Sequence, residues 1–209
     1  MNKVFLYTKY YCPACRKLKT FLTKRRVPFD YVDLDRLGSE KARLHGDEAY
    51  KLSGSRAVPV VRVGREVRVG FDPDWLTRTL DLPKGGKEGA FTLEDWQGDP
   101  ALAPRRAALQ LIYQPVVQAL GYKFSPDVQE VAFLLEQLVR NEAAHGIPFC
   151  PCKFLSGDRE QDLKTVCPCI PFHRRHFDSM RRCWCGLYVR EDVEDAASLR
   201  QVPDGEVTA

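Results

Sequence analysis

Residues 4–22 read VFLYTKYYCPACRKLKTFL. The run over residues 4–7 is apolar and is typical of a β-strand, and after the cysteines apolar residues recur at helical spacing: Leu18, Phe21 and Leu22. Cys12 and Cys15 lie between these two patterns. A strand, a C-x-x-C pair and an amphipathic helix in this order are typical of a redox-active thiol pair in an α/β fold.

The residues that follow predict the rest of an α/β domain. Expected elements are a strand at 29–34, a helix at 39–53, strands at 58–63 and 66–69, and a closing helix capped by Asp74 that runs through Leu80. The order β-α-β-α-β-β-α assigns residues 1–82 to one domain.

The remainder of the chain is predicted to be mainly helical. Pro and Gly break the periodicity over 83–103, which is expected to be a linker. Helices are predicted near 104–120 and 126–144, the second with Ser125-Pro126 as cap and first position. Residues 146–190 are Cys-rich with short helical pieces, and the acidic stretch 191–209 is expected to be a disordered tail.

Bulk composition is that of an ordinary globular protein, with 44% hydrophobic and 29% charged residues in 209. No apolar run is long enough to cross a membrane, and the first strand begins at once, so neither a membrane span nor a signal peptide is expected. We therefore expect a cytoplasmic protein. A net charge of +4 is too small to favour nucleic acid. A basic body with an acidic tail suits acidic protein partners, or is ordinary solvated surface.

The C-x-x-C pair has a direct chemical interpretation. A cysteine at a helix N-terminus is favoured as thiolate by the helix dipole and the free N–H groups. Lys9 and Arg16 add positive charge nearby. Cys12 is the predicted nucleophile and Cys15 the resolving thiol. The alternative is half of a zinc site, for which this domain offers only His45 as a further ligand.

Six further cysteines form three C-x-C pairs: Cys150-Pro151-Cys152, Cys167-Pro168-Cys169 and Cys183-Trp184-Cys185. Six thiols exceed the four that a zinc ion or a 4Fe–4S cluster accepts. The spacing leaves three explanations open. They are four cluster ligands with a redox-active pair, structural zinc with two idle cysteines, or two disulfides with two spare thiols.

The N-terminal motifs resemble those of glutaredoxins. Tyr11-Cys12-Pro13-Ala14-Cys15 resembles their active site, Val58-Pro59 lies where the family has a substrate-binding cis-proline, and Gly70-Phe71-Asp72-Pro73-Asp74 resembles glutaredoxin-like donors of ribonucleotide reductase. The resemblance implies a thioredoxin fold and a set of substrate-binding residues: Lys9, Tyr11, Val58, Pro59, Gly70 and Asp72. Ala57 in place of Thr, and Val69-Gly70 in place of Gly-Gly, count against glutathione binding.

The three C-x-C motifs resemble, over residues 104–190, the catalytic chain of ferredoxin-thioredoxin reductase. The resemblance implies a mainly α domain and a role for each thiol. A 4Fe–4S cluster would be bound by Cys150, Cys167, Cys169 and Cys183, and an active-site disulfide would join Cys152, which attacks the partner disulfide, to Cys185.

Two departures from that family lie around the last pair. Trp184 replaces a His of that family, and His173 or His176 is a candidate substitute for it. The simpler interpretation is that both are surface histidines without such a role. The chain is also longer between Cys169 and Cys183, and the extra residues around 172–177 form either a basic docking surface or a short helix.

Together the resemblances imply a disulfide reductase. Electrons would pass from ferredoxin through the 4Fe–4S cluster and the Cys152/Cys185 pair to Cys12/Cys15, and then to a client such as ribonucleotide reductase, a peroxidase or thioredoxin. Two alternatives stay open: a glutathione-dependent glutaredoxin with a structural zinc module, and a non-catalytic iron–sulfur carrier or redox sensor.

Overall fold

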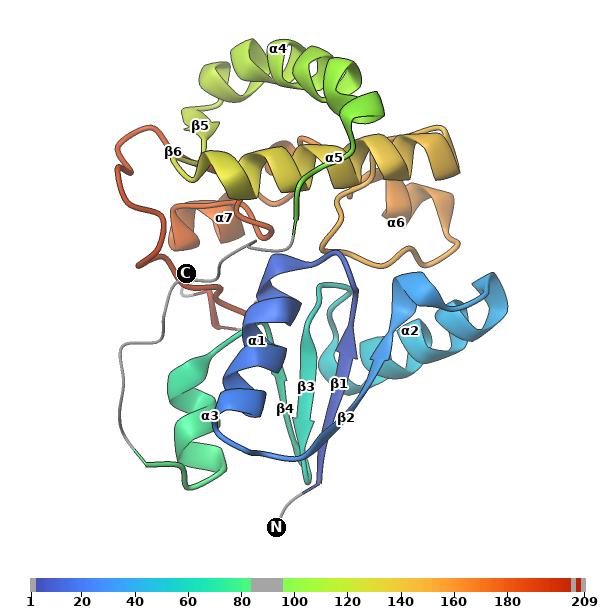
Figure 1. Ribbon diagram of the computed structural model, residues 1–209, viewed down its shortest axis with the longest axis vertical. Coiled ribbons are helices and arrows are strands. Elements are labelled where there is room, and N and C mark those ends of the chain that lie inside the picture. Colours follow the sequence, from blue (N-terminus) through green and yellow to red (C-terminus); the bar gives the residue numbers. More distant parts are fainter. Residues whose placement is uncertain (1–2, 84–95, 204–205, 208–209) are drawn as a thin grey trace. The chain divides into compact units, whose positions relative to one another are not determined.

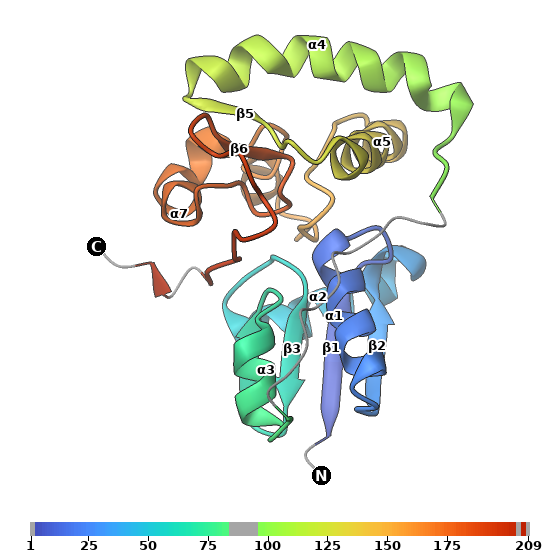
Figure 2. The ribbon, with the colours of Figure 1, turned by 60° about the vertical axis from the view of Figure 1, so that its left-hand side comes forward.

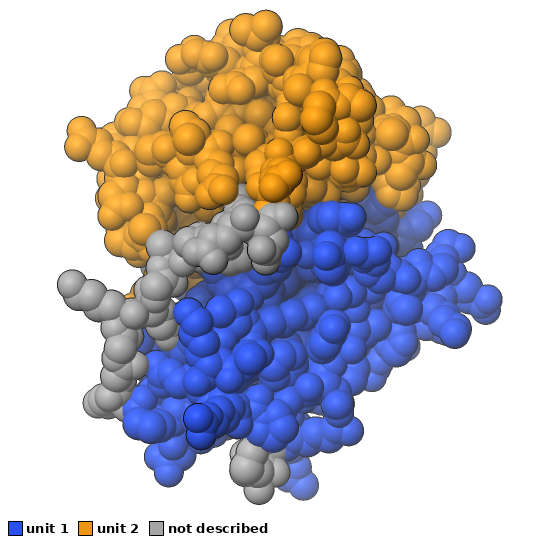
Figure 3. All heavy atoms as spheres, in the orientation of Figure 1, with its two compact units in different colours: residues 1–91, 152–157, 203–206 blue, residues 92–151, 158–202, 207–209 orange. Residues whose placement is uncertain are grey.

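A computed structural model describes residues 3–83, 96–203 and 206–207 of the chain (Figure 1). The chain divides into two compact units, coloured separately in Figure 3. Unit 1 comprises residues 1–91, 152–157 and 203–206, and unit 2 comprises residues 92–151, 158–202 and 207–209. The short stretch from Cys152 to Gly157 thus belongs to unit 1, although it lies among the C-x-C pairs in the sequence.

Unit 1 is built on a four-stranded sheet in the order β2-β1-β3-β4. Its elements are β1 (Val4–Thr8), α1 (Pro13–Lys24), β2 (Phe29–Asp33), the 3-10 turn η1 (Leu34–Arg36), α2 (Ser39–Ser53), β3 (Val60–Val63), β4 (Glu66–Val69) and α3 (Pro73–Thr79). β1 pairs in parallel with β2 and antiparallel with β3, which pairs antiparallel with β4. This topology confirms the predicted thioredoxin fold.

Alternation along β1 divides the side chains between the two faces of the sheet. Val4 and Leu6 belong to the main apolar core, together with residues of α1, α3 and β3: Leu18, Phe21, Leu22, Leu76, Val61 and Val63. On the opposite face Tyr7 is buried and bonds to Glu48 of α2. The sheet is therefore covered by α1 and α3 on one face and by α2 on the other, as Figures 1 and 2 show.

Unit 2 is mainly helical. Its elements are the 3-10 turn η2 (Pro100–Leu102), α4 (Ala103–Ala119), β5 (Tyr122–Phe124), α5 (Val128–His145), α6 (Arg159–Leu163), the 3-10 turn η3 (Ile170–Phe172), α7 (Arg174–Met180) and β6 (Tyr188–Arg190). α4 packs on α5, and β5 pairs antiparallel with β6. Among the described residues, no helix combines the length and apolarity that a membrane crossing demands.

Two predicted helix caps are wrong. α3 is capped by Asp72, which accepts the Trp75 N–H at 2.9 Å, and not by Asp74. α5 is capped by Asp127, which accepts the Glu130 N–H at 2.9 Å, and not by Ser125. In both cases the carboxylate of the residue just before the helix accepts a backbone N–H that the helix leaves without a partner.

The predicted linker and tail also differ from expectation where the structure describes them. Trp96 packs edge-on against Phe133 of α5, with ring centroids 5.5 Å apart, so the last part of 83–103 belongs to unit 2. Residues 84–95 lie outside the described residues. In the acidic tail, Val193 is buried and the Gln201 side chain donates to the Trp184 carbonyl at 2.9 Å. Apolar burial and this buried hydrogen bond order a segment whose composition predicted disorder.

Candidate active site

Cys12 lies at the N-terminus of α1, where the predicted nucleophile was expected. Its backbone is extended, and its Sγ accepts the Cys15 N–H at 3.3 Å. Pro13 begins the helix, a position at which the missing N–H costs nothing. Both thiols are fully buried, and neither forms a disulfide.

The two thiols have opposite acidities. Burial raises the pKa of Cys12, but hydrogen bonds from the Cys15 and Cys152 thiols and from the Cys15 N–H, together with the Lys9 charge, hold it well below that of an ordinary thiol. The pKa of Cys15 is raised well above the ordinary value by burial and then by its hydrogen bond to Cys12 and the negative charge there. The lowered pKa favours the thiolate at Cys12 over Cys15, and a thiolate is the form that the predicted nucleophile needs.

Val58, Pro59 and Gly70 come together beside Cys12. The Cys12 thiol lies 4.0 Å from the Val58 carbonyl, and the Val58–Pro59 peptide bond is cis. The Gly70 N–H donates to the Pro59 carbonyl at 2.7 Å. Three of the predicted substrate-binding residues therefore line one edge of the thiol site.

The segment from Cys152 to Phe154 lies along this edge and forms an antiparallel β-bridge, Lys153 with Ala57. The Val58 N–H donates to the Cys152 carbonyl and the Phe154 N–H donates to the Arg56 carbonyl, both at 3.1 Å. The Lys9 ammonium donates to the Lys153 carbonyl at 3.0 Å. The Cys152 thiol is thereby brought into hydrogen-bonding contact with the Cys12 thiol. The sequence did not predict this pairing.

Tyr11 and Asp72 have other partners. The Tyr11 N–H lies 3.3 Å from an Asp35 carboxylate oxygen, and the Asp72 carboxylate, besides capping α3, pairs with Arg68 at 2.7 Å. Arg68 also pairs with Glu206. The contacts that the structure gives Tyr11 and Asp72 thus stabilise the fold around the site.

In unit 2 Cys150 is held beside the Cys167-Pro168-Cys169 pair. The Cys150 N–H donates to the Thr165 carbonyl at 2.8 Å, and the Cys167 N–H donates to the Pro148 carbonyl at 3.0 Å. Phe149 and Val166 form a β-bridge between these bonds. Cys150, Cys167 and Cys169 are buried, and none forms a disulfide.

The third pair joins this group through Tyr188. The Tyr188 hydroxyl lies 3.3 Å from the Cys167 Sγ, and its N–H donates to the Cys183 Sγ at 3.2 Å. The Cys183 and Cys185 sulfurs are 3.6 Å apart. Tyr188 is buried and lies three residues after the last cysteine; it was not among the predicted site residues.

The thiols of unit 2 suit an iron–sulfur cluster. Burial raises the pKa of Cys167, and the Tyr188 hydrogen bond opposes that rise, while the charges of Cys150 and Cys183 add to it. These three thiols therefore interact electrostatically. Among the described residues, no group of three or more His, Cys, Asp or Glu side chains is placed to hold a metal ion. The donor type, a buried cysteine that forms no disulfide, is the one that iron–sulfur clusters take.

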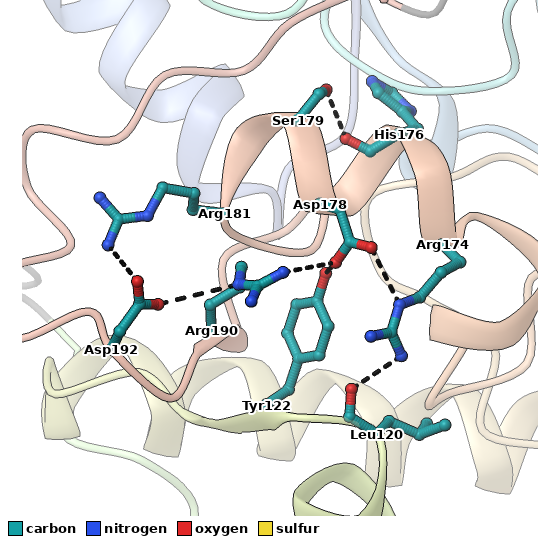
Figure 4. A network of polar contacts seen from close by, with 9 residues as sticks. All are labelled: Leu120, Tyr122, Arg174, His176, Asp178, Ser179, Arg181, Arg190 and Asp192. Carbon is teal, nitrogen blue, oxygen red and sulfur yellow. Dashed lines mark hydrogen bonds and ion pairs between the residues drawn. The ribbon is translucent and has the colours of Figure 1, made fainter. Parts of the chain in front are cut away.

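The extra residues before Cys183 contribute to a short helix, α7. Of the two interpretations offered, a basic docking surface or a short helix, the structure has the helix. Its Asp178 carboxylate accepts hydrogen bonds from the Tyr122 hydroxyl at 2.7 Å and from Arg174 at 3.0 Å, and it pairs with Arg190 at 3.3 Å (Figure 4). A second Arg174 nitrogen donates to the Leu120 carbonyl at 2.7 Å. These contacts hold α7 against β5 and β6.

The two candidate histidines lie in different surroundings. The His176 ring packs on Trp184, with centroids 5.6 Å apart, and its Nε2 contacts the Val202 carbonyl. His173 contacts the Lys164 carbonyl at 3.1 Å. Of the two, His176 is the one that the structure brings to the residue in place of the family's histidine.

Comparisons with known proteins match the two halves of the chain separately. Residues 105–207 match the family described as ferredoxin thioredoxin reductase catalytic beta chain, and residues 4–68 match glutaredoxin. The ferredoxin-thioredoxin reductase catalytic chain of Guillardia theta is 31% identical over 77 residues, which is 36% of this chain and 71% of that one. Its counterpart from Synechocystis sp. is 27% identical over 116 residues, or 54% and 90% of the two chains.

The N-terminal half has a relative of its own. The glutaredoxin-like protein NrdH of Escherichia coli K12 is 31% identical over 81 residues, which is 39% of this chain and 93% of that protein. The two matched regions support a disulfide oxidoreductase with two thiol sites. The chain belongs to the ferredoxin thioredoxin reductase catalytic beta chain family through residues 105–207 and to the glutaredoxin family through residues 4–68.

Proposed function

We propose that the chain is a disulfide reductase that accepts single electrons from ferredoxin, or from a similar small electron-transfer protein, and delivers them in pairs to client disulfides through Cys12 and Cys15. The observation that supports this proposal most directly is the position of Cys152. Its carbonyl pairs with Val58, and its thiol contacts the Cys12 thiol. A thiol from the C-x-C pairs thus lies where the sulfur of a substrate would react with Cys12.

Four thiols are proposed as ligands of a 4Fe–4S cluster: Cys150, Cys167, Cys169 and Cys183. When bound, the cluster would supply electrons one at a time to an adjacent Cys152–Cys185 disulfide. Reduction of that disulfide takes up two electrons and two protons and leaves two thiols. Cys152 and Cys185 are each two positions from a proposed ligand, Cys150 and Cys183 respectively.

Thiol–disulfide exchange then moves the electron pair to the glutaredoxin-like site. The Cys152 thiolate attacks the Cys12 sulfur of the Cys12–Cys15 disulfide, forming a Cys12–Cys152 disulfide and releasing Cys15. Burial raises the pKa of Cys15, so the released Cys15 takes up a proton and ends the step as a thiol. Cys185 attacks Cys152, restores the Cys152–Cys185 disulfide and displaces Cys12 as a thiolate. A thiol of low pKa is a good leaving group in this step.

Reduced Cys12 attacks a client disulfide, and Cys15 resolves the mixed disulfide. Clients of the kinds expected from the sequence, such as ribonucleotide reductase, a thiol peroxidase or thioredoxin, offer a disulfide of this type. We propose that the chain acts in the cytoplasm, a reducing compartment in which clustered cysteines serve as metal or redox sites.

Metal analysis and a one-electron reduction assay test the proposal on the full chain. Anaerobically purified protein is expected to contain about four irons and four sulfides. Photoreduced ferredoxin is expected to reduce the Cys12–Cys15 disulfide in the wild type and not in Cys152→Ser, while dithiothreitol reduces it in both. Stoichiometric zinc without iron, or reduction of Cys152→Ser by ferredoxin at the wild-type rate, would contradict the proposal; zinc with glutathione turnover would favour the glutathione-dependent alternative.

A further inference from the structure

The groove beside Cys12 binds its occupant at two positions that are two residues apart. The Cys152 carbonyl and the Phe154 N–H both pair with main-chain groups, those of Val58 and Arg56. Main-chain bonds of this kind accept any extended segment and do not depend on its sequence. Selectivity must therefore come from the side chains that the groove contacts.

The side chain two positions after the cysteine enters a pocket of its own. Phe154 is 5% exposed, and its ring lies over Gly46 of α2. A Cβ at position 46 would lie 3.1 Å from the Phe154 Cδ2, tighter than ordinary van der Waals contact. The Arg56 guanidinium lies 5.7 Å from the centre of the Phe154 ring and 4.6 Å from that of Tyr50. Gly46 and Arg56 lie against Phe154, and Tyr50 lies against Arg56. We call these three residues the aromatic pocket.

We propose that the aromatic pocket is a specificity site for client proteins, and that it favours an extended segment with an aromatic residue two positions after the cysteine that Cys12 attacks. Side chains alternate along a strand, so the residue after the cysteine points away from the pocket while the next one points into it. This inference rests on the proposed function, because it requires that Cys12 react with protein disulfides.

The same groove cannot hold two segments at once. The chain's own segment Cys152–Phe154 and a client segment therefore compete for the bonds to Arg56 and Val58. Transfer from Cys152 and transfer to a client must alternate, and each begins only after the other segment has left the groove.

Two synthetic peptides test the pocket directly. One is Ser-Pro-Cys-Lys-Phe-Leu-Ser, with its cysteine in a mixed disulfide with 2-nitro-5-thiobenzoate, and the other has Ala in place of Phe. The protein is the full chain with Cys152→Ser and Phe154→Ala, which removes the competing thiol and ring, reduced with dithiothreitol and freed of it anaerobically. Cys12 attacks the peptide sulfur and displaces yellow nitrothiobenzoate. Cys15 then attacks Cys12 and releases the peptide thiol, so the dithiol gives two electrons to the probe disulfide. Background is measured with Cys12→Ser.

The Phe peptide is expected to react about 30-fold faster than the Ala peptide, because burial of a phenylalanine ring has that order of effect. Adding Gly46→Leu is expected to remove the preference by filling the pocket, and Gly46→Ala to reduce it. Both residues favour helix more than glycine does, so α2 is retained. Gly38→Leu is the matched control, since a Cβ at Gly38 meets nothing within 4 Å, and it is expected to keep the preference.

Equal rates for the two peptides, or a preference that survives Gly46→Leu, would overturn the inference. The assay uses neither ferredoxin nor a cluster, so its failure is separable from failure of the proposed function. If the Phe peptide is not preferred while ferredoxin still reduces Cys12–Cys15, only the role of the aromatic pocket is refuted. A preference that is present while ferredoxin-driven reduction fails supports the pocket and refutes the proposed electron source.

Discussion

Replacing Phe154 by alanine is expected to uncover Cys12. Burying a phenylalanine side chain contributes about 1.5–3 kcal/mol relative to leaving it in water. The ring is 5% exposed, so nearly all of that contribution holds the segment in the groove. A loss of about 2 kcal/mol lowers the ratio of docked to undocked segment about 30-fold, since every 1.4 kcal/mol is about a factor of ten.

Alkylation by iodoacetamide measures this change in the reduced full chain. Cys12 is fully buried with the segment docked, so the alkylation rate follows the undocked fraction. Mass mapping of the Cys12 peptide is expected to show a rate about 30-fold higher in Phe154→Ala than in the wild type. Rates are compared on the plateau at high pH, because the variant also loses the hydrogen bond from Cys152 that helps to lower the pKa of Cys12.

Phe172→Ala is the matched control, because that ring is 61% exposed and the same atoms are removed without uncovering the site. It is expected to leave the alkylation rate unchanged. Equal rates in Phe154→Ala and the wild type would refute the reasoning: the segment would not be what covers Cys12, and the direct transfer from Cys152 would lose its structural basis.

Three further outcomes are expected. Burial raises the pKa of Cys12 and Lys9 is one of the groups that lower it, so Lys9→Met moves the midpoint of the alkylation pH profile upward, and the variant reacts more slowly than the wild type as pH falls. Cys150→Ser loses most of the iron and sulfide found after anaerobic purification, whereas Phe172→Ala retains both. Burial raises the pKa of Asp178, but Tyr122 and two arginines hold it below its ordinary value. The contribution of ionised Asp178 to the free energy of unfolding is therefore complete above the unfolded-state pKa of about 3.9, and it is lost as pH falls through the folded-state pKa. Urea unfolding is expected to show Asp178→Asn about 1–3 kcal/mol less stable at neutral pH and the difference shrinking in acid.

Most of unit 1 follows from local sequence patterns. Apolar residues at period two in β1 and at helical spacing in α1 are enough to place both elements, and the C-x-x-C between them puts Cys12 at a helix N-terminus. The caps of α3 and α5 were misassigned because two capping residues flank a proline at both starts, Asp72 and Asp74 at α3 and Ser125 and Asp127 at α5. Several of those residues are competent caps, and only the backbone path decides which one reaches the first turn.

Docking of Cys152 is a different kind of feature. It depends on hydrogen bonds between residues 56–58 and 152–154, which lie far apart in the chain and contain no pattern that pairs them. The tail residue Gln201 and the Tyr188 hydroxyl are similar cases, since each acts through a single long-range contact, with Trp184 and Cys167. Composition and periodicity describe average environments and do not predict such individual contacts.

Gly46 also has a consequence for protein engineering. It is a buried glycine inside a helix, where alanine would gain about 1 kcal/mol in helix propensity but would bring a Cβ to 3.1 Å from the Phe154 ring. A programme that raises thermal stability by replacing helical glycines would choose this position early. If the aromatic pocket acts as proposed, the resulting protein would select its clients less well. Position 46 is thus a place where helix propensity and discrimination between substrates are in conflict.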